Sequence, residues 1–204
     1  EWLGVLWHGL SLDCTVAGYV TAFPVLVALA SFWIPLSQRV WRIVLTVYFS
    51  LIALVTAAIF AVDLNLYGYW GFRLDGSVLI YLSDPGEALA SASWGEVLRQ
   101  ILIMLVYAGA MIWSYRWILR LFRVEPVPLR GRIVPTVAAL LIGGLTFLAI
   151  RGGVTVATAN VSKVYFSSNM FLNHAATNPV FSFLSSVGDN ENLSLIHISE
   201  PTRL

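Results

Sequence analysis

The hydrophobic pattern of the chain consists of long runs without a charged residue, separated by short polar segments. Four of these runs cover residues 14–38, 43–62, 100–115 and 133–150. An α-helix of about 20 apolar residues crosses the hydrocarbon core of a bilayer, and helices satisfy their own backbone hydrogen bonds there. Each run therefore predicts a transmembrane helix, and the expected spans are 14–36, 43–62, 97–116 and 133–150.

Two local signals refine the first and third spans. Ser93 and Glu96 have the spacing of a capping box, in which each side chain hydrogen-bonds the backbone N–H group of the other residue. We therefore expect the third helix to begin near Trp94. Pro24 lies inside the first run, where it removes one backbone hydrogen bond. We interpret it as a tolerated kink in a membrane helix.

Two segments outside the spans have a pattern of their own. In residues 154–186, Lys163 and many Asn and Ser residues interrupt every window long enough to cross a membrane. This pattern favours short interfacial helices with a break before Pro179. In residues 63–97, an N-cap-like Asp84 followed by Pro85 and Glu87 predicts a short helix through about Ser91.

Composition supports the same interpretation. Hydrophobic residues make up 58% of the 204 residues and charged residues 11%, and the mean hydropathy is +0.80. Ordinary soluble domains contain about twice that charged share. The predicted fold class is an all-α, polytopic membrane helix bundle with four transmembrane helices and interfacial helices.

The distribution of arginines predicts the orientation of the bundle. The segments between spans one and two and between spans three and four contain Arg39, Arg42, Arg116, Arg120, Arg123, Arg130 and Arg132, against Glu125 alone. Because basic loops stay in the cytoplasm, we expect residues 1–13, 63–97 and 151 onward to lie outside the cell.

The sequence shows no motif that identifies a catalytic, cofactor-binding or metal-binding residue. His8, His174 and His197 are far apart and lack neighbours at metal-ligand spacing. Cys14 is interpreted as a small core residue. The net charge of +1, without a concentrated basic face, gives no basis for a nucleic-acid partner.

Some charged and aromatic residues are candidates for contact with lipid. Arg116, Arg120 and Arg123 recur at helical spacing, and an anchor on anionic membrane lipid is favoured over a specific phosphate site. Arg73 and Asp75 are interpreted as a local salt bridge, or as simply solvated side chains, rather than as a headgroup site. Aromatic rings that suit the boundary between membrane and water follow the second span, at Tyr67, Tyr69, Trp70 and Phe72.

Four stretches resemble a known family: GLSLD at 9–13, GYWGFRLD at 68–75, RGG at 151–153 and NVSKVYFSSNMFLNHAATNPVFSFLSS at 160–186. They are similar to the N-terminal membrane part of lipoteichoic acid synthase-like phosphoglycerol transferases of the alkaline phosphatase and sulfatase superfamily, in Bacteroides-type bacteria. The resemblance implies a multi-pass anchor of five helices, the first missing here, in the bacterial cytoplasmic membrane. It also implies an extracytoplasmic catalytic domain after residue 186, holding a divalent metal, manganese or zinc.

The C-terminal residues resemble a sequence that is unrelated to this family. Residues 193–203, LSLIHISEPTR, are similar to the translation of a transposon-end adapter used in sequencing libraries. The expected organisation is therefore a transmembrane domain at 1–153, an extracytoplasmic connector to the missing catalytic domain at 154–192, and a non-native tail at 193–204.

Several functions stay open at this stage. The leading hypothesis is the membrane anchor of a lipid-dependent phosphoglycerol or phosphoethanolamine transferase, in which the intact parent is an enzyme and this part carries no active site. A parent that hydrolyses sulfate esters is a second possibility. The alternative is a standalone integral membrane scaffold or permeability protein. The predicted partners are membrane lipid and the chain's own catalytic domain, and oligomeric state is not predicted.

Overall fold

The computed structural model describes residues 1–79, 93–123 and 128–188, and these contain helices and no strands. Four of the helices are long and apolar enough to cross a membrane: α1 (Trp2–Ser31), α2 (Gln38–Trp70), α5 (Trp94–Leu121) and α6 (Ile133–Arg151). The expected all-α bundle with four membrane helices is confirmed. The short helix expected at 84–91 and the tail at 193–204 lie outside the described residues.

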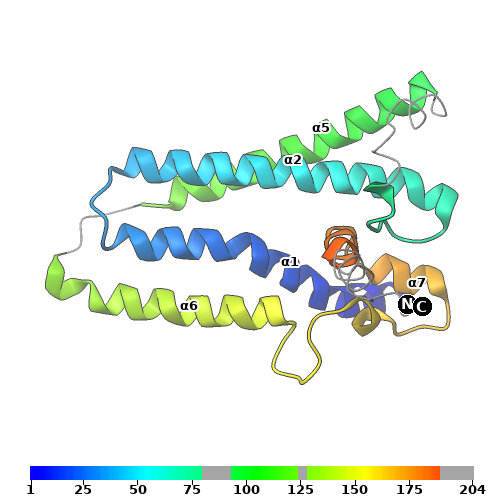
Figure 1. Ribbon diagram of the computed structural model, residues 1–204. Helices are drawn as coiled ribbons and strands as arrows, with labels where there is room; N and C mark the ends of the chain where they lie inside the picture. Colours follow the sequence, from blue (N-terminus) through cyan, green and yellow to red (C-terminus); the bar gives the residue numbers. More distant parts are fainter. Residues whose placement is uncertain (80–92, 124–127, 189–204) are drawn as a thin grey trace, which may run out of the picture.

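The four long helices form two side-by-side pairs (Figure 1). One pair is α2 with α5, and the other is α1 with α6, while α1 and α2 contact each other sparsely. Small residues permit close approach within the second pair. A Cβ atom on Gly18 of α1 would lie only 3.0 Å from the backbone N of Ile150 in α6, and the buried Thr15 hydroxyl donates to the Ala149 carbonyl oxygen at 3.0 Å.

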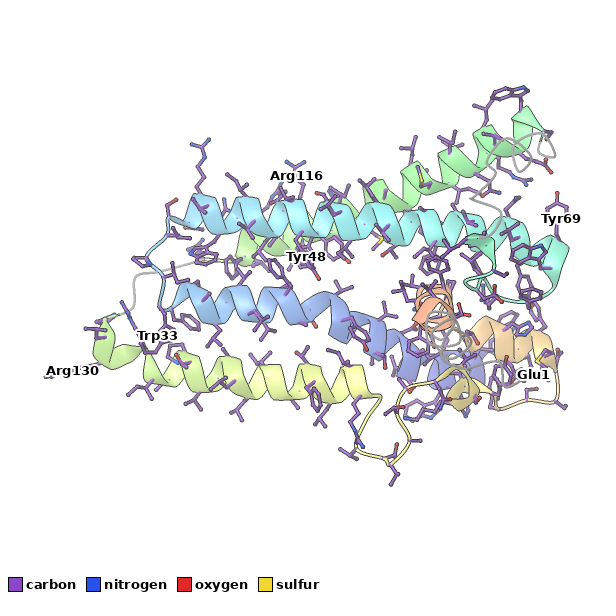
Figure 2. All side chains as sticks on the ribbon, viewed as in Figure 1. Glu1, Trp33, Tyr48, Tyr69, Arg116 and Arg130 are labelled. Atoms are coloured by element: carbon purple, nitrogen blue, oxygen red, sulfur yellow. The ribbon has the colours of Figure 1, made fainter. Side chains whose placement is uncertain are left out.

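The two ends of the bundle differ in the segments that lie there. At the arginine-rich end, on the left in Figure 1, the turn between α1 and α2 lies near the short 3₁₀-helix η1 (Leu129–Gly131). At the connector end, on the right, residues 154–188 fold back onto α1 and α2. Figure 2 shows Trp33 and Arg130 at the first end and Glu1 and Tyr69 at the second.

The first two helices are longer than the spans expected from their apolar runs. α1 has 30 residues and α2 has 33, which corresponds to about 45 and 50 Å of helix, whereas the hydrocarbon core is about 30 Å thick. At the connector end, α1 adds residues 2–13 and α2 adds residues 63–70. At the arginine-rich end, α2 also adds residues 38–42. Asp13 and Asp63, which look like loop residues in the sequence, are therefore helical.

The predicted start of α5 is confirmed. α5 begins at Trp94, and Ser93 and Glu96 form both hydrogen bonds of the capping box. Gly152 ends α6 in the left-handed conformation at φ 83°, with its N–H donating to the Ala149 carbonyl, as expected of a helix-ending glycine.

Pro24 lies within α1, which continues to Ser31. A proline cannot donate to the carbonyl four residues before it, so the Val20 carbonyl loses its usual partner. The Tyr48 hydroxyl of α2 donates to this oxygen at 2.8 Å, and Figure 2 shows Tyr48 between the two helices. The proline is thus accommodated by a contact between the two helix pairs.

The connector contains the expected short helices. They are η2 (Val161–Val164), α7 (Met170–Ala176) and a helix over Pro179–Gly188. The predicted break before Pro179 is confirmed, since α7 ends at Ala176. Val164 and Leu172 pack into a core with Val5 and Leu12 of α1, so part of the connector's apolar surface is buried against the bundle.

Candidate functional site

A cluster of polar side chains at the connector end centres on Asp63. This aspartate is 1% exposed. Its Oδ2 forms an ion pair with Arg73 Nη1, and its Oδ1 accepts from the Leu74 N–H at 2.9 Å. Both carboxylate oxygens are therefore satisfied, as a buried charge requires.

Gly71 explains how Arg73 reaches back to Asp63. It caps α2 with φ 71°, a conformation that favours glycine, and its N–H donates to the Tyr67 carbonyl. The chain reverses there, which places Arg73 and Leu74 beside the last turns of α2. The prediction that Arg73 pairs with Asp75 is wrong, because Asp75 instead accepts from the backbone N–H of Ser77.

Arg73 also joins α2 to the connector. Its Nε donates to the His174 carbonyl oxygen in α7 at 2.8 Å, and its guanidinium carbon lies 5.4 Å from the centre of the Tyr67 ring. Tyr67 OH lies 3.2 Å from His174 Nδ1. One aspartate, one arginine and one tyrosine from the α2 side thus position α7.

His174 has an altered proton affinity in this environment. Partial burial, and then the nearby positive charge of Arg73, lower its pKa from the ordinary value of 6.5. The neutral imidazole can accept a hydrogen bond from the Tyr67 hydroxyl through Nδ1. A protonated ring could only donate to the Tyr67 oxygen, and it would place a second cation beside Arg73.

α1 supplies the other surface on which the connector lies. A Cβ atom on Gly9 would lie 2.9 Å from the Ala176 carbonyl oxygen, so only glycine allows α7 to approach this closely. Asp13 Oδ1 accepts from Asn178 Nδ2 at 2.7 Å across 165 positions of sequence. His8 stacks on Phe166 of the connector with ring centres 4.4 Å apart.

The four stretches that carry the family resemblance meet at this end of the molecule. Residues 9–13 contact the connector through Gly9 and Asp13, and residues 68–75 contact it through Arg73. Residues 151–153 contact it through Gly152, whose carbonyl accepts from Lys163 Nζ at 2.7 Å. Three separate stretches of the chain therefore contact the fourth.

The remaining residues singled out in the sequence have different environments. Cys14 is exposed, so its interpretation as a core residue is wrong. Tyr69 is 70% exposed and Phe72 43% exposed, whereas Trp70 packs against a buried cluster that includes Leu74 and Val180.

The described residues contain no group of three or more His, Cys, Asp or Glu side chains able to hold a metal ion. His8 and His174 each contact an aromatic ring of the neighbouring segment. The chemistry that these side chains perform in the structure is hydrogen bonding and packing between helices.

Comparisons with known proteins add no family assignment. No family model, curated protein or solved structure matches the chain.

Proposed function

We propose that the chain is the membrane anchor of a lipid-dependent phosphoglycerol or phosphoethanolamine transferase whose catalytic domain follows the connector. The observation that carries the proposal is the convergence at one end of the bundle of the four stretches that resemble this family. Four membrane-length helices, against the five that the resemblance implies, and a connector hydrogen-bonded to them are consistent with such an anchor.

The arginines support an orientation for this anchor. Residues at the arginine-rich end, including Arg39, Arg42, Arg116 and Arg120, favour the cytoplasmic side. The connector end then faces the cell exterior in a bacterial cytoplasmic membrane. A catalytic domain attached there would act on headgroups of the outer leaflet, and anchoring would raise its effective concentration near that substrate.

The connector's attachment gives the anchor a positioning role. Arg73 and Asn178 link the connector to α2 and α1 by hydrogen bonds, so a following domain would start from a defined place. Because α1 and α2 continue past their apolar runs, that place lies beyond the predicted spans. A divalent metal, manganese or zinc, belongs to the proposed catalytic domain and would supply Lewis-acid activation of a phosphate ester there.

The first experiment reads the parent gene from genomic DNA and fuses reporters after Ser186. We expect an in-frame metallophosphoesterase-like domain, an active alkaline phosphatase fusion and a non-fluorescent green fluorescent protein fusion. A parent gene that stops directly after the connector, or a reporter in the cytosol, would overturn the proposal in favour of a standalone membrane protein.

The second experiment tests positioning in the intact parent protein with Tyr69→Ala/Phe72→Ala. Trp70 is left in place because it packs in the interior. We expect slower turnover of phosphatidylglycerol or phosphatidylethanolamine in vesicles and unchanged turnover of a soluble phosphodiester. The matched control is Tyr19→Ala/Phe147→Ala, which removes the same side-chain types from positions that are 61% and 63% exposed within the spans. Equal loss on both substrates would refute the positioning role.

A further inference from the structure

The arginine-rich end carries guanidinium groups that no described side chain neutralises. Arg42 lies on α2, and Arg116 and Arg120 lie on α5, which packs against α2. Across residues 1–79, 93–123 and 128–188 the one ion pair joins Arg73 to Asp63, at the opposite end. The charge of these three arginines is thus available to an external anion.

These three arginines line one cavity between α2 and α5. It has a volume of about 450 Å³, and its other walls are Thr46, Trp113, Trp117 and Leu119. A second cavity of about 510 Å³ shares Arg42 and Thr46 and adds Gln38 and Arg39. Arg42 therefore stands between two adjoining spaces, both lined by arginine.

The α5 side of the cavity has a regular order. Trp113, Arg116, Trp117 and Arg120 are separated by three, one and three positions, which places them on one face of the helix. Trp113 is 73% exposed and Trp117 59% exposed. Tryptophan side chains suit the boundary between apolar chains and polar headgroups, and arginines bind phosphate oxygens through two parallel N–H groups.

We propose that this cavity binds a phosphate group, carried either by an anionic lipid headgroup or by a soluble phosphate. Arg42 contributes from one helix and Arg116 and Arg120 from the other, so the bound anion would bridge α2 and α5. The mutual repulsion of three guanidinium groups around one space favours a ligand of negative charge. The inference is independent of the proposed transferase function, because it concerns only residues of this chain.

The test counts lipids bound to the purified full chain by native mass spectrometry, in an equal mixture of phosphatidylglycerol and phosphatidylcholine. We expect preferential binding of phosphatidylglycerol, and an affinity lowered about tenfold or more in Arg116→Gln/Arg120→Gln, because the variant loses the charge-assisted hydrogen bonds of two guanidinium groups to the phosphate. The matched control is Arg123→Gln/Arg130→Gln, which removes two exposed arginines of the same end that do not line the cavity. Its binding should be nearly unchanged.

Two arms separate the sources of phosphate. If inorganic phosphate at millimolar concentration displaces phosphatidylglycerol, the cavity takes a soluble phosphate; if the lipid binds and inorganic phosphate does not compete, it takes a headgroup. Either result supports the inference. Equal loss of phosphatidylglycerol binding in the two double glutamine variants would indicate a diffuse basic surface and overturn the inference. No loss of binding in either variant would also overturn it.

A folding control accompanies the variants. Circular dichroism should show unchanged helix content in Arg116→Gln/Arg120→Gln. Should that variant fail to fold, Arg116→Lys/Arg120→Lys replaces it, because lysine keeps the charge and lacks the planar fork. A loss of binding of about threefold is then expected, and wild-type binding in the lysine variant would overturn the arginine geometry proposed here.

Discussion

The two ends of the bundle both contain arginine, and they use it differently. At the connector end, Arg73 is paired with a buried carboxylate and donates to the backbone of α7. At the arginine-rich end, Arg42, Arg116 and Arg120 line a cavity. An arginine that is paired inside the protein, such as Arg73, holds segments of the fold together. An arginine that lines a cavity, such as Arg42, can bind a ligand.

This difference predicts where substitutions will affect stability. Removing a partner at the connector end leaves a buried polar group unsatisfied, which is costly. Removing an arginine from the opposite cavity leaves no group without a partner among the described residues. The four predictions that follow test this contrast, from the largest expected effect to the smallest.

Replacing Asp63 with alanine should have the largest effect. Arg73, whose side chain is 20% exposed, loses its ion-pair partner, and the Leu74 N–H loses its acceptor. Breaking a buried pair by removing one partner costs about 3 kcal/mol. Hydrogen exchange of α7 amides in detergent should accelerate accordingly.

Asp75→Ala is the control for that substitution, because the sequence suggests Asp75 as the partner of Arg73. It should cost about 1 kcal/mol or less, as expected for the loss of a local cap. An effect as large as that of Asp63→Ala would contradict the pairing described here.

Gly9→Ala should have the next largest effect. The added methyl group meets the Ala176 carbonyl oxygen at 2.9 Å, so α7 must move away from α1, at a cost of about 2 kcal/mol. Gly144→Ala in α6 is the control, because a Cβ atom there meets nothing within 4 Å. Alanine should be tolerated or should stabilise the helix by up to about 1 kcal/mol. Thermal unfolding of both variants measures the difference, and equal melting temperatures would contradict the close packing at Gly9.

Acidification should loosen the connector end by a smaller amount. Burial and Arg73 lower the pKa of His174 from 6.5, so the unfolded chain binds a proton at a pH where the folded chain does not. Stability is then retained above pH 6.5 and falls as the pH decreases from this value towards the lowered pKa. Hydrogen exchange of α7, corrected for the intrinsic pH dependence, should show this loss in the wild type and not in His174→Gln. The same pH response in both proteins would exclude His174 as its source.

Arg116→Gln/Arg120→Gln should have the smallest effect on stability in neutral phosphatidylcholine. The free energy of unfolding should change by less than about 0.5 kcal/mol, the range of ordinary surface substitutions. Denaturant titration of the protein in lipid nanodiscs measures this value. A loss comparable to that of Asp63→Ala would show that these arginines hold the fold, and the contrast between the two ends would disappear.

Local patterns predicted much of the fold because their causes lie within a few residues. The charge-free runs indicate the four membrane helices, and the Ser93–Glu96 pair indicates the start of α5. Pro179 indicates the break after α7 for the same reason. Each of these signals depends on backbone chemistry that neighbouring residues determine.

The ends of α1 and α2 could not be located in this way. Asp13 and Asp63 look like the beginnings of polar loops, because a charge in an apolar context suggests exposure to water. Asp63 is instead helical and buried, since Arg73, 10 positions later, returns after the turn at Gly71. The pattern of hydrophobic and polar residues does not predict that the chain reverses at Gly71 and places Arg73 beside Asp63.

Neither the cluster around Asp63 nor the arginine-lined cavity could be predicted from the sequence. His174 and Arg73 are 101 positions apart, and Arg42 belongs to a different helix from Arg116 and Arg120. The helical spacing of Arg116, Arg120 and Arg123 indicated a shared helix face correctly for the first two, but α5 ends at Leu121, before Arg123. The contribution of Arg42 and the cavity itself depend on how α2 and α5 pack. The sequence resemblance drew attention to four stretches without indicating that three of them contact the fourth.

The contact between Arg73 and His174 has a mechanical consequence. The turn after α1 joins the two helix pairs at one extremity, and this hydrogen bond ties α2 to a segment seated on α1 at the other. The two pairs are consequently joined at both extremities. A motion that separates them at the connector end has to release this guanidinium group, the Tyr67–His174 contact and the packing of Ile59 and Leu74 on Val180.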